Sequence, residues 1–193
     1  MFTEQDNIYW RDFSLLINGN FEERKYWYSP KVIYSYKGFE ITFDNYFFSK
    51  VSNHNTYDSI VTRVYCKFIY PEHLKFRLEQ ASIINRLINL FNGKLYKTSD
   101  LVFDRKYQVH SNNKDFIKLL NSHIRQSLLI NTIDGLFIDN QEGIWGDYLP
   151  ENVYGITLYL NSQRLVNSEL LELKKTFESI VDQLINQFLI KPF

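Results

Sequence analysis

The sequence has few of the residues that small folds use as covalent staples or chain breakers. Its 193 residues include one cysteine, 7 glycines and 4 prolines. A single cysteine excludes an internal disulfide framework and any zinc site built from several thiolates, and it fits a reducing compartment. The scarcity of glycine and proline argues against a loop-rich scaffold. Aromatic residues are abundant instead, at 17% of the chain, and favour a packed sheet.

The chain also lacks a net charge. Lys and Arg together number 22, as do Asp and Glu, and the parts before and after residue 100 each depart from neutrality by two charges. Nucleic acid is therefore disfavoured as a partner, since no basic field steers the protein to phosphate backbones. No uncharged apolar run reaches the roughly 18 residues that a bilayer span needs, and the acidic N-terminus does not resemble a signal peptide. We expect a cytoplasmic protein without a membrane span.

The length and composition predict a single domain over residues 1–193. Hydrophobic residues make up 45% of the chain and charged residues 23%, which are ordinary proportions for a globular protein. A chain of this length buries well over half of its unfolded surface in one core. No stretch rich in Pro, Gly or Ser divides it.

Residue periodicity predicts an α+β fold. A helix is expected from Thr3 to Ile17, with Thr3 and Asp6 as a capping box. Alternating apolar residues predict strands at residues 32–36, 39–43, 60–70, 74–79, 101–110, 136–138 and 153–160. Helical spacing predicts helices at residues 81–91, 116–128 and 167–188. The first four strands are expected to form a meander, with residues 50–59 as a loop, and the largely antiparallel sheet is expected to be covered by helices, including one at each end of the chain.

One run in the middle of the chain follows a recognisable pattern. Residues 100–113 read DLVFDRKYQVHSNN and precede an apolar helix and a short strand. The run resembles bacterial proteins of unknown function in which F-D-x-x-Y/F-x-V-x-S-x-D/N marks a strand leading into a helix. Asn113 stands where such sequences often have Asp. The resemblance implies the α+β architecture and no particular activity.

The residue types that bind metals or perform catalysis are scattered along the sequence. The histidines, His54, His73, His110 and His123, lack the close spacing of zinc fingers or metalloprotease motifs. The acidic loop at residues 139–147 does not fit the ligand register of an EF-hand. Neither a G-x-S-x-G elbow nor a glycine-rich phosphate loop is present. We expect no metal ion and no cofactor.

Two stretches are candidates for contact with a partner. Tyr26, Trp27 and Tyr28 follow one another between basic residues, and three neighbouring aromatics cannot all face inward from one strand. Trp145 lies in the polar loop at residues 139–147. These four aromatics are the candidate binding residues, and packing over the core is the alternative. The terminal helix, with nearly heptad spacing, either covers the sheet or mediates a homodimer.

Three functions remain open at this point. The leading one is a non-enzymatic protein-interaction or regulatory module of the cytosol, which binds a protein partner or a second copy of the chain. The second is an enzyme whose site assembles from separate strands, with His110, Asp104 or the acids near Asp147 contributing. The third is a binding protein of the immunity or antitoxin type, which no residue singles out.

Overall fold

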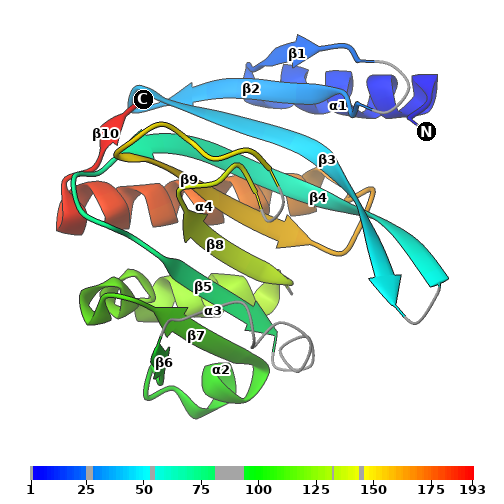
Figure 1. The fold of residues 1–193 in the computed structure, drawn as a ribbon. Coiled ribbons are helices and arrows are strands. Elements are labelled where there is room, and N and C mark those ends of the chain that lie inside the picture. Colours follow the sequence, from blue (N-terminus) through cyan, green and yellow to red (C-terminus); the bar gives the residue numbers. More distant parts are fainter. Residues whose placement is uncertain (1, 25–27, 53–54, 81–93, 132, 144–145) are drawn as a thin grey trace.

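The computed structural model describes residues 2–24, 28–52, 55–80, 94–131, 133–143 and 146–193. Its architecture is α+β, with a large antiparallel sheet and a helix near each end of the chain, as the sequence predicts (Figure 1). The helices are α1 (Glu4–Ile17), α2 (Leu101–Lys106), the 3-10 helix η3 (Lys114–Leu119), α3 (Ser122–Ile130) and α4 (Asn167–Phe188). The strands are β1 (Asn20–Glu22), β2 (Lys31–Tyr36), β3 (Phe39–Ser52), β4 (Asn55–Ile69), β5 (Phe76–Gln80), β6 (Lys94–Tyr96), β7 (Tyr107–Ser111), β8 (Gly135–Asp139), β9 (Val153–Leu160) and β10 (Lys191–Pro192).

The described strands form one sheet in the order β1-β2-β3-β4-β9-β8-β5-β7-β6, and β10 pairs with β4. The predicted meander is correct from β2 to β4 and wrong beyond it, because β9 and β8 lie between β4 and β5. β9 is buried along its whole length and pairs with β4 from Thr62↔Leu160 to Ile69↔Val153. A strand that is buried on both faces belongs in the interior of a sheet, where neighbours satisfy both of its edges.

The structure corrects the predicted strand at residues 101–110. Its first part is the helix α2, and β7 begins only at Tyr107. The Asp100 carboxylate accepts hydrogen bonds of 3.1 Å from the backbone N–H groups of Val102 and Phe103, which starts a helix at that point. The apolar alternation at residues 101–110 therefore spans two elements, a short helix followed by a strand.

The predicted loop at residues 50–59 is also wrong. β3 and β4 continue as a two-stranded ribbon to the pair Ser52↔Asn55 and extend past the body of the sheet (Figure 1). The pairing of β4 with β9 ends at Thr62, so the ribbon is paired only with itself in the described chain. Polar residues are compatible with such a ribbon because no second layer has to be packed there. The helix predicted at residues 81–91 lies outside the described residues.

The helices α1, α3 and α4 cover one face of the sheet, and the core lies between them (Figure 1). Five apolar residues repeat along α4 and are fully buried: Leu170, Leu173, Phe177, Ile180 and Leu184. They share one hydrophobic cluster with residues of the central strands, such as Val64 of β4 and Leu158 of β9. The apolar spacing of the terminal helix thus serves packing on the core, which is the first of the two alternatives that its sequence raises.

Buried polar contacts tie α1 to the sheet and to the segment before α4. The Trp10 indole N–H donates to the Asn45 side chain at 3.0 Å, and the Asn45 amide donates to the Gln163 carbonyl at 2.8 Å. Arg164 forms a salt bridge of 2.9 Å with the buried Asp6. These partners are far apart in sequence, so the contacts fix the position of α1 relative to β3 and to the segment before α4.

Truncation of the α4 stripe should destabilise the whole domain. Phe177→Ala removes a fully buried ring from the layer between α4 and the sheet. We expect the free energy of unfolding to fall by about 3–5 kcal/mol, the usual cost of such a cavity, in urea denaturation. The matched control is Leu15→Ala, at a side chain that is 77% exposed on α1, with an expected change of less than about 0.5 kcal/mol. Equal losses in the two variants would contradict the assignment of α4 to the core.

Candidate functional site

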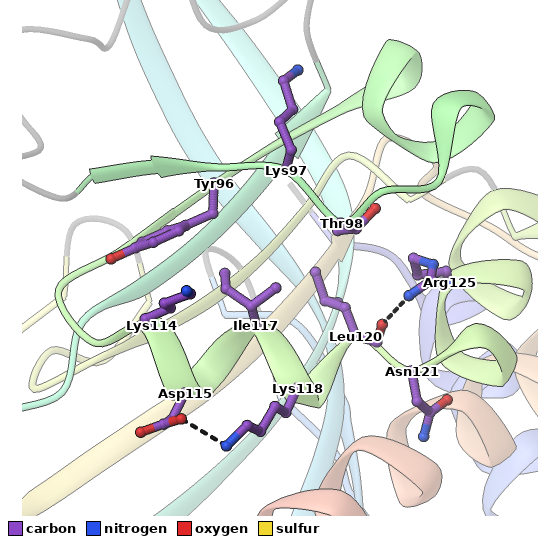
Figure 2. Close-up of a pocket in the computed structure, with 10 residues that line it drawn as sticks. All are labelled: Tyr96, Lys97, Thr98, Lys114, Asp115, Ile117, Lys118, Leu120, Asn121 and Arg125. Carbon is purple, nitrogen blue, oxygen red and sulfur yellow. Dashed lines mark hydrogen bonds and ion pairs between the residues drawn. The ribbon is translucent and has the colours of Figure 1, made fainter.

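A groove of about 620 Å³ opens between β6 and the helical segment that follows β7 (Figure 2). It is lined by residues 96–98 in and after β6, by residues from 114 to 121 in and after η3, and by Arg125 of α3. We call it the basic groove. Its volume lies in the range that accommodates small ligands or a short stretch of peptide.

Two capping asparagines create the helical wall of the groove. The Asn113 side chain accepts a hydrogen bond of 2.9 Å from the Asp115 N–H at the start of η3, and Asn121 accepts one of 2.9 Å from the Ile124 N–H at the start of α3. These caps divide the helix that periodicity predicts at residues 116–128 into two short helices. The resulting turn presents residues between the two helices to β6.

The floor of the groove is apolar. Ile117 and Leu120 rise from the helical wall toward β6, and the Tyr96 side chain descends from β6 toward that wall (Figure 2). The neighbouring Phe116 and Leu119 are fully buried in the core. The wall therefore has one face in the protein interior and another that lines the groove.

Cations surround this floor, and they differ in their partners. Lys118 forms a salt bridge of 2.7 Å with Asp115, and this hydrogen bond lowers the pKa of the Asp115 carboxyl. Arg125 donates to the Leu120 carbonyl at 2.6 Å and is therefore engaged within the fold. Lys97 and Lys114 form no salt bridge in the described part of the chain, although the Lys114 charge also helps to lower the pKa of Asp115. They are the groove cations that a ligand can pair with at no cost to an existing ion pair.

The groove lies in a basic region of an otherwise neutral chain. Residues 94–131 contain seven Lys and Arg against three Asp and no Glu, an excess of four positive charges that the rest of the chain balances. The two parts of the chain divided at residue 100 conceal this excess, because that boundary cuts the basic region. A local concentration of one sign around a cleft attracts ligands of the opposite sign.

Asp100 and Thr98 fix the chain segment that leads from β6 into α2. The Asp100 carboxylate accepts from the Phe103 N–H at the start of α2 and from the Arg125 guanidinium at 3.3 Å. These hydrogen bonds, with that from Phe103 the strongest, hold the pKa of Asp100 below its ordinary value. The Thr98 hydroxyl donates to Asp104 at 2.8 Å. The groove rim is thus held by α2 and α3 together.

A second polar cluster is buried on the opposite face of the sheet. Arg63 of β4 donates to the Asp44 carboxylate at 2.8 Å and lies over the Tyr46 ring, 4.7 Å from its centroid. Burial by itself lowers the pKa of Arg63, but the Asp44 charge outweighs it and raises the pKa. Glu142, from the segment between β8 and β9, reaches Lys67 at 3.3 Å across this face. Because Arg63 is only 8% exposed, this cluster braces the sheet and the segment over it.

A second groove, of about 480 Å³, lies near the end of α4. Ile69 and Tyr70 line one side and Gln187, Phe188 and Leu189 the other. Its lining has one acid and one cation and so carries no charge bias. It lacks the feature that distinguishes the basic groove.

The aromatics predicted to bind a partner do not line the basic groove. Tyr28 is 67% exposed, and the Arg24 guanidinium lies 5.7 Å from the centre of its ring. Tyr26, Trp27 and Trp145 lie outside the described residues. The four therefore remain untested as binding residues.

The residues considered for catalysis are separated in the structure. Asp104 lies on α2 and accepts hydrogen bonds from Thr98, whereas His110 lies on β7. Asp147 is exposed in the segment between β8 and β9. None of the three lines the basic groove. Among the described residues, no group of three or more His, Cys, Asp or Glu is placed to hold a metal ion.

Residue periodicity does not reveal the basic groove because it predicts neither wall correctly. It indicates no secondary structure at residues 94–98 and an unbroken helix at residues 116–128. The excess of basic residues between 94 and 131 was the one signal available. This excess of basic residues indicates a binding site only once the fold places β6 beside η3.

The Asp100 carboxylate should contribute stability that depends on pH. Its folded-state pKa lies below the ordinary value of about 3.9, so its contribution is present above that pH and is lost as the pH falls through the folded pKa. Asp100→Asn retains an amide oxygen for the cap and removes the charge. We expect thermal unfolding to show a lower Tm for this variant at pH 7 and a difference that shrinks below about pH 4. Asp147→Asn, at an exposed site, is the control, and a difference that is independent of pH would contradict this role.

Comparison with known proteins finds a distant likeness to one solved structure. No protein-family model and no curated protein matches the sequence. Among solved structures, the mycobacterial trehalose monomycolate transport factor A is similar over 93% of this chain and 96% of that one, at 8% sequence identity and a TM-score of 0.49. No helix in the described residues is long and apolar enough to cross a membrane.

Proposed function

We propose that the protein is a non-enzymatic binding module that engages an acidic segment of a partner protein through the basic groove. One observation carries this proposal. Lys114 lies at one end of the apolar floor made by Ile117 and Leu120, and Lys97 extends from β6 on the side away from that floor; neither lysine forms a salt bridge in the described chain. A ligand can therefore pair with positive charges and also bury an apolar surface, and both contacts favour binding.

The two kinds of contact contribute in different ways. Apolar side chains that cover Ile117, Leu120 and Tyr96 supply the non-directional part of the affinity, at roughly 25 cal/mol per Å² before the costs of association. Carboxylates beside Lys97 and Lys114 supply orientation and a faster encounter. Specificity for acidic segments follows because neutral segments leave both ammonium groups without partners.

An acidic protein segment fits these features better than a nucleic acid does. The basic excess is confined to residues 94–131, and the chain as a whole is neutral. Proteins that follow a phosphate backbone usually carry a longer basic track and pair most of its cations with phosphates. Here Lys118 and Arg125 are already engaged, so the free cations are few, and the floor of the groove is apolar.

Reversal of the two free cations tests the proposal. The probe is a fluorescein-labelled peptide of roughly ten residues in which Glu and Val alternate, with fluorescence anisotropy as the measurement. We expect Lys97→Glu with Lys114→Glu to weaken binding by about tenfold or more, because two favourable pairs become repulsive contacts and about 1.4 kcal/mol corresponds to tenfold. Binding by the unaltered protein should also weaken as salt is raised.

The matched control changes the same charge elsewhere. Lys175→Glu with Lys191→Glu alters two exposed lysines that do not line the basic groove. This variant should bind the probe within about twofold of the unaltered protein. The proposal fails if the two double variants lose affinity equally, if a Gln and Val peptide binds as well as the Glu and Val probe, or if single-stranded DNA of equal charge binds more tightly.

A further inference from the structure

We infer that the partner segment binds in extended form, as an added strand on the free edge of β6. This inference rests on the proposed function of the basic groove. β6 is the last strand in the sheet order and pairs with β7 alone in the described chain, from Lys94↔Ser111 to Tyr96↔Val109. One row of its backbone N–H and C=O groups therefore has no strand partner there, and an extended peptide can satisfy such a row.

Apolar side chains of the helical layer face the groove beside β6. Tyr96 points from β6 toward the helical wall, and Ile117 and Leu120 rise from that wall within the groove (Figure 2). A strand added beside β6 would lie about 4.8 Å away and would place alternate side chains on the same side as Tyr96. Those side chains would meet the apolar floor, so the added strand would have a core to cover as well as an edge to pair with.

Lys97 and Lys114 define where acids on an added strand would be favoured. Lys97 extends to the side opposite the floor, one residue after Tyr96 (Figure 2). Side chains that alternate with those on the floor point to the side of Lys97, where acids are favoured. Lys114 lies at one end of the floor, next to Ile117, where a further acid can pair with it (Figure 2). The expected ligand thus alternates apolar and acidic residues.

The same charges argue against a second copy of the chain as the occupant. Two β6 edges brought together would place Lys94 and Lys97 of each copy beside those of the other, within two regions that each carry an excess of four positive charges. Like charges across an interface are destabilising, and edge lysines commonly prevent pairing between identical edges. An acidic strand from another protein turns these same lysines into favourable contacts.

Backbone methylation of the Glu and Val probe tests strand addition. N–H groups of successive residues in a strand point to opposite edges, so those of one residue type would face β6 and those of the other would face solvent. Two versions of the probe carry N-methyl groups on all Val amides or on all Glu amides. We expect one version to bind at least about tenfold more weakly than the parent and the other to stay within about threefold.

The outcomes separate this inference from the proposed function. If both methylated versions bind as the parent does, while the Lys97→Glu and Lys114→Glu variant still weakens binding, strand addition is overturned and the groove remains the binding site. An equal loss of affinity in both versions also overturns strand addition, because only every second N–H of an added strand would face β6. If the parent probe does not bind, or if the charge reversals have no effect on its binding, the proposed function itself fails.

Discussion

The packing of α4 against one face of the sheet forms the centre of the hydrophobic core. Its stripe, which includes Phe177 and Leu184, fills the layer over the central strands, and α1 and α3 lie in the same layer (Figure 1). Strands from distant parts of the sequence are brought together beneath it, most clearly where β9 pairs with β4. The basic groove lies at the end of the sheet, between β6 and the segment that contains η3.

The two faces of the sheet are stabilised by different physical chemistry. The helix-covered face is apolar and packs against the buried stripe of α4. The other face holds Arg63 and Asp44 beneath the segment between β8 and β9. Loss of either ionic partner there would leave a buried charge uncompensated, which generally costs several kcal/mol. Breaking such a pair is costly, whereas exposed cations such as Lys97 and Lys114 are available for a partner. This difference separates the structural cluster from the candidate site.

Much of the fold could be predicted from local periodicity, and its order in space could not. The opening helix, the hairpin of β2 and β3, β9 and the terminal helix all agree with their apolar spacing. Periodicity failed where a single polar side chain decided the outcome, as Asp100 does by starting α2 within an alternating run. It also cannot place β9 and β8 between β4 and β5, since that arrangement depends on pairing between distant segments. The basic groove was missed for the same reason, because its two walls meet only in three dimensions.

The location of the bound probe shows directly whether the basic groove is the binding site. Titration of the Glu and Val peptide into ¹⁵N-labelled protein, followed by amide chemical shifts, reports every backbone N–H at once. We expect the largest shifts at residues 94–98 and 114–125, with small changes elsewhere. Shifts centred on Tyr28, or on the second groove beside Phe188, would contradict the assignment of the binding site to the edge of β6.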